Sequence, residues 1–236
     1  MRALVTGAAG GIGRECVKLL AAKENMDIIA VSRSQEALRI LQTEIKNDYK
    51  KDIIVIASDF HKNGFEKEII NNIKLEGGTI QYLINNAGLL INRSYEEMEE
   101  GDVEDQLRIN YTAPLLLTRA LMPFLKKSKE EAHVVNIGSM GGYQGSSKFK
   151  GLSAYSASKA AIAVLTECLA VEYADSNVKF NCLALGSANT KMLRRAFPDY
   201  ISPMAPQKMA EFIVDFTLKG HAYFNGKVLP VGGTSI

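Results

Sequence analysis

The stretch Thr6-Gly7-Ala8-Ala9-Gly10-Gly11-Ile12-Gly13 lies between a short apolar run and a helical pattern, and it decides the fold. The run Ala3–Thr6 has the pattern of a β-strand, and the apolar residues within Ile12–Ala22 recur at helical spacing. Glycines permit a tight turn, and the start of the helix offers unpaired backbone N–H groups. A strand, a glycine-rich turn and a helix in this order predict the first unit of a sheet in which strands and helices alternate.

The same alternation continues along the chain. Strands that are apolar throughout and are separated by helices are typical of a parallel sheet covered on both faces. We therefore expect an α/β fold, a three-layer doubly wound parallel sheet (Rossmann fold) of about seven strands with helices on both faces. The expected strands are Ala3–Thr6, Ile28–Ser32, Ile53–Ala57, Tyr82–Asn85, Val134–Gly138, Phe180–Leu183 and Lys227–Pro230. The expected helices include Ile12–Ala22, a stripe of Leu38, Leu41 and Ile45, and about Asp102–Met122, Ala154–Ala174 and Gln207–Leu218.

Composition excludes several classes of protein. The 236 residues carry 28 Lys and Arg against 26 Asp and Glu, a net charge of +2, which is far from the basic surface of a nucleic-acid-binding protein. No linker or repeat interrupts the pattern, so we expect one domain over residues 1–236. Cys16, Cys168 and Cys182 lack the spacing of a disulfide framework or a metal site. Because no apolar run has the length of a membrane span and no signal peptide is evident, we expect a cytoplasmic protein.

The glycine turn is a candidate phosphate site, because a pyrophosphate can lie at the N-terminus of the helix that it opens. Gly7, Gly11 and Gly13 follow the spacing Gly-x-x-x-Gly-x-Gly. The second strand ends in Ser32, followed by Arg33, where an NAD site would carry an acidic residue on the ribose 2′-hydroxyl. Since a guanidinium can bind a 2′-phosphate through two charge-assisted hydrogen bonds, we expect NADP(H), with NAD(H) the less favoured cofactor. The alternative is an ordinary surface arginine at the start of the second helix.

Four polar residues form a candidate catalytic group. Tyr155 and Lys159 lie four residues apart, on one face of an expected helix. A nearby ammonium lowers the pKa of a phenol, so we expect Lys159 to prepare Tyr155 to donate a proton to a carbonyl oxygen. Ser139 follows the strand Val134–Gly138, where its hydroxyl could bind a substrate oxygen or could hold a glycine-rich turn. Asn110 lies within a helix, which asparagine disfavours, and it either holds a water linked to Lys159 or is a satisfied polar kink.

These motifs together resemble the short-chain dehydrogenase/reductase family over essentially the whole chain, with similarity to its 3-oxoacyl-ACP-reductase-like and carbonyl-reductase-like members. The family's glycine motif is similar to Thr6–Gly13, its Asn-Asn-Ala-Gly motif to Asn85–Gly88, and its closing strand to Asn225–Gly233. The resemblance implies that Tyr155 is the acid or base, Ser139 orients the substrate, Lys159 holds the nicotinamide ribose and Asn110 anchors a proton-relay water. It implies cofactor contacts at Gly7, Ala9, Gly11, Ile12, Gly13, Ser32, Arg33, Asp59, Phe60, Asn86, Ala87, Gly88, Tyr155, Lys159, Gly186 and Thr190, with Asp59 at the adenine.

Three features depart from the family pattern. Leu185-Gly186 stands where the family has Pro-Gly, so the loop on the nicotinamide side lacks a fixed φ. Ser139 and Tyr155 are separated by a longer interval than usual, and the extra length falls in the polar loop 145–151, where Ser147 is a weak substitute for Ser139. The substrate loop at about 187–206 is short.

The resemblance implies an NADPH-dependent oxidoreductase that transfers a hydride between a nicotinamide cofactor and a small carbonyl or alcohol substrate. The alternatives are an alcohol dehydrogenase working in the oxidative direction and a noncatalytic NADP-binding sensor or regulatory protein. We expect no bound metal, no nucleic-acid partner and no membrane partner. The resemblance also implies a homodimer or homotetramer, paired largely through the helices at Asp102–Met122 and Ala154–Ala174.

Overall fold

A computed structural model of the protein describes residues 1–75 and 78–232, and its strands form one parallel sheet. The strand order β3-β2-β1-β4-β5-β6-β7 reverses direction between β1 and β4, as in a doubly wound fold. The expected fold class and the expected strands are confirmed, and no strand end differs from its expected position by more than two residues. The strands are β1 (Arg2–Thr6), β2 (Asp27–Ser32), β3 (Ile54–Ala57), β4 (Tyr82–Asn85), β5 (Ala132–Ile137), β6 (Val178–Leu185) and β7 (Lys227–Val231). Gly233 of the closing motif lies outside the described residues.

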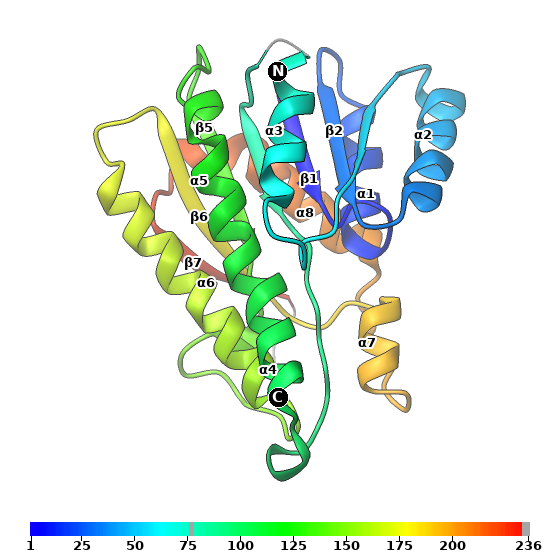
Figure 1. Cartoon of the computed structure of the whole chain (residues 1–236), viewed down its shortest axis with the longest axis vertical. Coiled ribbons are helices and arrows are strands. Elements are labelled where there is room, and N and C mark those ends of the chain that lie inside the picture. Colours follow the sequence, from blue (N-terminus) through cyan, green and yellow to red (C-terminus); the bar gives the residue numbers. More distant parts are fainter. Residues whose placement is uncertain (76–77, 233–236) are drawn as a thin grey trace.

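Helices cover both faces of the sheet (Figure 1). They are α1 (Gly11–Ala21), α2 (Gln35–Tyr49), α3 (Phe65–Leu75), α4 (Glu100–Leu107), α5 (Ala113–Leu125), α6 (Ser153–Glu172), α7 (Lys191–Ala196) and α8 (Pro206–Lys219). Short 3₁₀ turns occur at Tyr95–Glu97, Met140–Gly142 and Gly220–Ala222, and a π-turn spans Arg108–Thr112. Helices α4 and α7 lie beyond the carboxyl ends of the strands, where ligands of such sheets bind.

Two apolar cores lie on opposite faces of the sheet. Successive side chains of a strand point to opposite faces, so Ala3 and Val5 of β1 belong to the core under α1, α2 and α8, whereas Leu4 belongs to the core under α3 and α5. The expected stripe of Leu38, Leu41 and Ile45 on α2 is fully buried in the first core. These cores hold the strand ends rigidly in place, and the polar residues of interest follow directly after those ends.

The expected helical stretch Asp102–Met122 is helical along its whole length, but a π-turn that the pattern did not predict separates α4 from α5 within it. In the π-turn the Ala113 N–H donates to the carbonyl oxygen of Arg108, five residues earlier. Pro114 has no N–H, so it cannot make the α-helical hydrogen bond to the carbonyl oxygen of Asn110, four residues earlier. The break therefore falls at the candidate residue Asn110.

Helix α6 has 20 residues and contains an 18-residue window with a mean hydropathy of 1.3, so its length and composition alone would allow it to cross a membrane. We interpret it as a helix that covers one face of the sheet in the α/β fold. Its buried face includes the polar residues Ser158, Lys159 and Thr166, and Asn136 of β5 donates to the Thr166 hydroxyl at 2.9 Å. Such a polar face fits contact with the sheet better than contact with lipid.

Candidate active site

The glycine turn after β1 is built for close backbone approach. Gly7 and Gly11 have positive φ angles of +65° and +53°, and a Cβ on Gly13 would stand 2.4 Å from both the carbonyl oxygen of Gly7 and Nδ2 of Asn86. Gly10 precedes α1 without a capping side chain, and the first helical turn has no acidic residue. The N-terminus of α1 thus keeps open N–H groups and a positive dipole, which suit a phosphate group.

The segment after β4 is attached to this turn by hydrogen bonds. Asn86 Nδ2 donates to the carbonyl oxygen of Thr6 at 2.9 Å, and the Thr6 hydroxyl accepts from the backbone N–H groups of Asn86 and Ala87 at 3.0 Å each. Asn85 lies below, where its Nδ2 donates to Asn136 Oδ1 at 2.8 Å. The side chains of Asn85 and Asn86 therefore support the sheet and the glycine turn.

The predicted adenine-side residues lie at the ends of β2 and β3, beside the glycine turn. The Ala8 N–H donates to the carbonyl oxygen of Val31 at 3.1 Å, which links the turn to β2. Arg33 is exposed, as a phosphate-binding side chain would need to be. The His61 N–H donates to Asp59 Oδ1 at 3.1 Å and lowers the pKa of the Asp59 carboxyl, to which the Arg33 charge also contributes.

Tyr155 and Ser139 meet at the carboxyl end of β5. Tyr155 is only 9% exposed, and this burial raises the pKa of its phenol, while the nearby Ser139 hydroxyl lowers that pKa in part. The expectation that Lys159 lowers the pKa of Tyr155 is wrong for the protein alone, because desolvation outweighs the other contributions. A raised pKa keeps Tyr155 protonated at neutral pH, which is the state that a proton donor requires.

Lys159 is buried one helical turn after Tyr155. Its Nζ donates to the carbonyl oxygen of Ile137 at 2.7 Å, and burial lowers its pKa to about 8. The thiol of Cys182 is a further neighbour, whose pKa burial raises to about 11, so that it stays neutral beside the ammonium at pH 7. A Cβ on Gly88 would lie 3.6 Å from Lys159 Nζ, which places the ammonium next to the segment after β4.

Ser139 also holds the glycine-rich turn that follows it, which was the alternative role expected from the sequence. Its Oγ accepts from the Gly141 N–H at 3.1 Å and so caps the 3₁₀ turn Met140–Gly142. That turn packs directly on α6, since a Cβ on Gly142 would stand 2.5 Å from the carbonyl carbon of Lys159. The close approach explains how Ser139 reaches Tyr155 in spite of the long loop between them, and it leaves Ser147 as an ordinary loop residue.

Asn110 is a satisfied polar side chain inside the π-turn. Its Oδ1 accepts from the Leu89 N–H at 2.8 Å, and its Nδ2 donates to the Leu89 carbonyl oxygen at 2.8 Å and to Ser158 Oγ at 2.9 Å. Ser158 Oγ in turn donates to the carbonyl oxygen of Tyr155 at 2.7 Å. Sequence reasoning missed Ser158, although the small-residue run around Tyr155 and Lys159 was a signal of close packing.

Gly186 lies beside the end of β7, and Thr190 lies beside Gly11 of the glycine turn. The Gly186 N–H donates to the carbonyl oxygen of Val231 at 2.7 Å, and the Thr190 hydroxyl accepts from the Leu193 N–H at 3.2 Å and caps α7. A Cβ on Gly11 would lie 3.5 Å from the Thr190 methyl carbon. The predicted substrate loop at about 187–206 therefore includes a capped helix that borders the cofactor residues.

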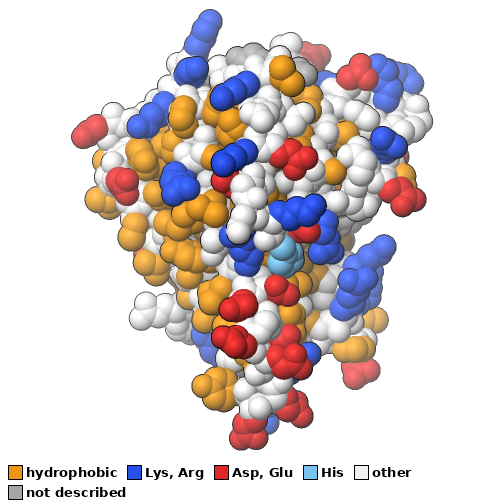
Figure 2. All heavy atoms as spheres, viewed as in Figure 1, with side chains coloured by type: hydrophobic (Ala, Val, Ile, Leu, Met, Phe, Trp, Pro, Cys, Tyr) orange, Lys and Arg blue, Asp and Glu red, His pale blue; other side chains and the backbone are white. Residues whose placement is uncertain are grey.

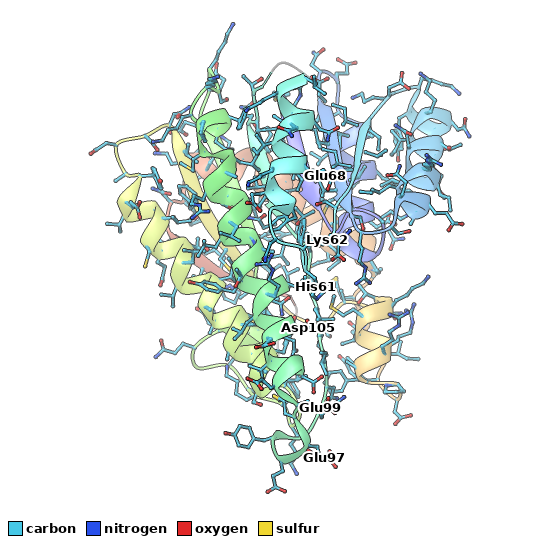
Figure 3. The ribbon with its side chains drawn as sticks, viewed as in Figure 1. His61, Lys62, Glu68, Glu97, Glu99 and Asp105 are labelled. Carbon is cyan, nitrogen blue, oxygen red and sulfur yellow. The ribbon has the colours of Figure 1, made fainter. Side chains whose placement is uncertain are left out.

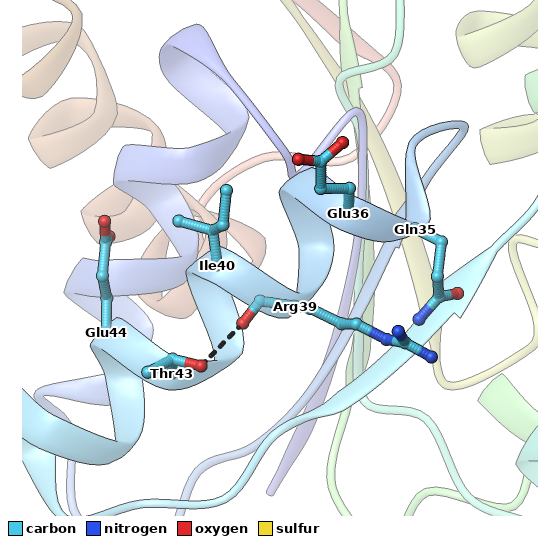
Figure 4. A pocket seen from close by; sticks show the side chains of 6 residues that line it. All are labelled: Gln35, Glu36, Arg39, Ile40, Thr43 and Glu44. Carbon is cyan, nitrogen blue, oxygen red and sulfur yellow. Dashed lines mark hydrogen bonds between the residues drawn. The ribbon is translucent and has the colours of Figure 1, made fainter.

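Two surface hollows lie outside this constellation. One, of about 600 Å³, is on the outer face of α2, where Gln35 and Arg39 extend to the same side (Figure 4). The other, of about 590 Å³, is bordered by Ser94–Glu96 and by residues 148–153 and 156, so the long loop forms part of its wall. Among residues 1–75 and 78–232, no group of three or more His, Cys, Asp and Glu side chains is placed to hold a metal ion.

Known proteins share both the sequence pattern and the fold. The family model for short chain dehydrogenases matches residues 1–201. The 3-oxoacyl-acyl-carrier-protein reductase FabG of Thermotoga maritima is 27% identical over 98% of this chain and 95% of its own length. The very-long-chain 3-oxoacyl-CoA reductase of Kluyveromyces lactis is 34% identical over 75% of this chain and 51% of its own length.

The fold match extends over nearly the whole chain. A solved short-chain dehydrogenase from Shigella flexneri 2a, in complex with NADP, superposes with a TM-score of 0.88 at 27% identity and covers 97% of this chain and 95% of its own. The chain is therefore an oxidoreductase of the short-chain dehydrogenase family, whose members act on CH–OH or carbonyl groups with NAD(P).

Proposed function

We propose that the protein is an NADP(H)-dependent carbonyl reductase in which Asn110, Ser139, Tyr155 and Lys159 carry the chemistry. The observation that supports this most directly is the buried Lys159 ammonium, which donates to the carbonyl oxygen of Ile137 at the end of β5 and faces Gly88, one helical turn from the buried Tyr155. A nicotinamide cofactor, when bound, supplies the hydride to the carbonyl carbon or accepts it from an alcohol. The same residues serve both directions.

The four side chains have different roles in substrate binding and proton transfer. The Ser139 hydroxyl donates to the substrate oxygen and orients the carbonyl, and the buried phenol of Tyr155 transfers its proton to that oxygen. Lys159, whose ammonium faces the segment at Gly88, binds the ribose hydroxyls and supports the charge that develops on Tyr155. Both donors of the Asn110 amide already have protein partners, so we assign the relay water to its backbone carbonyl, which Pro114 cannot bind.

The open N-terminus of α1 is assigned to the pyrophosphate, and Arg33 with Ser32 to the 2′-phosphate. A Cβ at Gly7 or Gly13 would clash with neighbouring atoms, and this need for glycine supports the assignment of the turn to the pyrophosphate. Asp59 and Phe60 are assigned to the adenine, and Gly186 and Thr190 to the nicotinamide side. NADP in the related Shigella flexneri structure agrees with the choice of cofactor.

We also propose one cytoplasmic domain that pairs with a second copy through α4, α5 and α6. Hydrophobic side chains gather on the surface over α5 and α6 (Figure 2), and Val164 and Val171 of α6 are 57% and 79% exposed. Such a patch favours association with another apolar surface. The mass in solution tests it, because V164E with V171E should give a monomer where the wild-type chain gives a dimer or tetramer.

A screen of NADPH oxidation across ketones, aldehydes, quinones and 3-oxoacyl thioesters tests the proposed activity. Turnover of at least one class is expected, and Tyr155→Phe should lower kcat by roughly 10² to 10⁴ while NADPH binding stays intact. Tyr143→Phe, on the loop after β5, is a matched control. Unchanged turnover in Tyr155→Phe would refute the mechanism, and tight NADPH binding without any turnover would favour a sensor.

A further inference from the structure

Arg108 is the first residue of the π-turn that carries Asn110, and its side chain leaves this turn to bind the loop after β3. Its Nε donates to the carbonyl oxygen of Phe60 at 2.7 Å, and its Nη2 donates to that of Lys62 at 2.9 Å. Its guanidinium carbon lies 5.7 Å from the ring centre of Phe65. A planar guanidinium presents its donors in a fixed fork and so holds two carbonyl groups at once, a geometry that the single ammonium of lysine does not reproduce.

A second contact joins the same two segments. The ring of His61 lies between two carboxylates, with Nδ1 3.2 Å from Asp59 Oδ1 and Nε2 3.2 Å from Asp105 Oδ1. Asp105 belongs to α4, one turn before Arg108. Figure 3 shows Lys62, His61 and Asp105 following one another from the loop down to α4. The loop is therefore held by two successive turns of this helical layer.

We propose that Arg108 is a positioning residue that couples the adenine side of the cofactor site to the π-turn at Asn110. The inference rests on the proposed function, in which Asp59 and Phe60 contact the adenine and the Asn110 backbone holds the relay water. Arg108 spans both parts, since its side chain binds the loop while its carbonyl oxygen accepts the hydrogen bond that closes the π-turn. Ordering of the loop by an adenine nucleotide thus orders the backbone two residues from Arg108, at Asn110.

Arg108→Lys tests the two hydrogen bonds of the guanidinium without a change of charge. Arg119→Lys is the matched control, because Arg119 is an exposed arginine on α5. The probe is 2′,5′-ADP, which carries the adenine and the 2′-phosphate but lacks the nicotinamide. We expect Arg108→Lys to weaken binding of 2′,5′-ADP and of NADPH by about tenfold, within the range typical of coupled sites, and also to lower kcat at saturating NADPH. Arg119→Lys should match the wild-type chain in all three measurements.

Hydrogen exchange separates coupling from simple support of the fold. In the wild-type chain and in Arg119→Lys, 2′,5′-ADP should protect the amides of residues 107–112, which it does not contact directly. In Arg108→Lys this remote protection should be lost, with the melting temperature close to that of the control. Equal protection of residues 107–112 in Arg108→Lys would overturn the proposal.

The failure of the proposed function would look different. If the wild-type chain binds neither 2′,5′-ADP nor NADPH, the cofactor assignment is refuted, whatever the variant does. The exchange rates without ligand then decide the role of Arg108 in joining the two segments. Faster exchange of both residues 60–65 and residues 107–112 in Arg108→Lys supports that role, and unchanged rates refute it.

Discussion

Lys159 Nζ donates a hydrogen bond of 2.7 Å to the backbone carbonyl oxygen of Ile137, and both residues are buried. Ile137 is the last residue of β5, two positions before Ser139. The bond therefore fixes the position of Lys159 relative to the end of β5, after which Ser139 follows. It also places the ammonium where burial lowers its pKa from 10.5 to about 8. The charged form of Lys159 is therefore less stable in the folded chain than in water.

Lys159→Met tests the cost of this charge. The folded pKa lies below the unfolded one, so the penalty is fully present below about pH 8 and is relieved as the pH rises towards 10.5. The free energy of unfolding of the wild-type chain, relative to Lys159→Met, should rise by about 2 kcal/mol between about pH 7.5 and pH 10. Urea unfolding of both chains at these two pH values measures it. A constant difference would show that the ammonium is not destabilised in the fold.

Ser139→Ala should separate orientation of the substrate from support of the turn. Loss of the hydroxyl that contacts Tyr155 should lower kcat by about 10² or more. Loss of its bond to the Gly141 N–H should lower the free energy of unfolding by about 1 kcal/mol. Ser147→Ala is the matched control in the same loop and should change neither quantity. A larger effect on kcat in Ser147→Ala than in Ser139→Ala would reverse the assignment.

Arg33→Ala should weaken NADPH binding and leave NADH binding nearly unchanged. Loss of charge-assisted hydrogen bonds to a 2′-phosphate costs about 1.5 to 3 kcal/mol, which is roughly a 10- to 150-fold rise in the Kd of NADPH. Arg39→Ala is the control, because Arg39 is an exposed arginine on α2 (Figure 4). Titration by cofactor fluorescence gives the Kd of NADPH and the Kd of NADH for the wild-type chain and for both variants. If Arg39→Ala changes the NADPH constant and Arg33→Ala does not, the phosphate lies over α2.

His133 should make stability depend on pH at the opposite end of the sheet. Its Nδ1 lies 3.0 Å from the carbonyl oxygen of Thr217 and its Nε2 lies 2.9 Å from Asn181 Nδ2, an arrangement that suits the neutral ring. Burial lowers the pKa of His133 to about 3 from 6.5. Its contribution to stability is therefore present above about pH 6.5 and is lost as the pH falls towards 3.

His133→Gln, whose amide can both donate and accept, removes this titration. Between about pH 6.5 and pH 5 the wild-type chain should lose about 1.5 kcal/mol of unfolding free energy relative to His133→Gln. Chemical denaturation at several pH values measures the difference, and His61→Gln, with a surface ring, gives the background. Parallel pH curves for wild type and His133→Gln would contradict the prediction.

Local pattern alone was enough for the elements and for several site residues. Most residues of the strands are apolar, and runs such as Ala3–Val5 of β1 and Ile28–Val31 of β2 are buried. Hydrophobic burial on both faces of the sheet leaves such runs few other structures. Tyr155 and Lys159 share a helix face because helical geometry aligns residues four apart. Arg33 could be placed near the glycine turn because parallel strands end at one edge of the sheet. Each of these inferences needs only periodicity or the rule for strand ends.

The contacts among distant segments were decided by the tertiary structure alone. Helical periodicity predicted one helix across Asp102–Met122, yet Asn110 binds Leu89 and Ser158 across the fold, and a π-turn accommodates it. The two hydrogen bonds of the Arg108 guanidinium to the loop after β3 were likewise not predictable from the sequence. Neither was the pKa of Tyr155, where sequence spacing suggested a neighbouring charge but burial has the larger effect. Sequence determined which residues stand at the strand ends, because periodic burial is a local property. Only the tertiary structure decided their partners and solvation, because these depend on segments that meet after the sheet has formed.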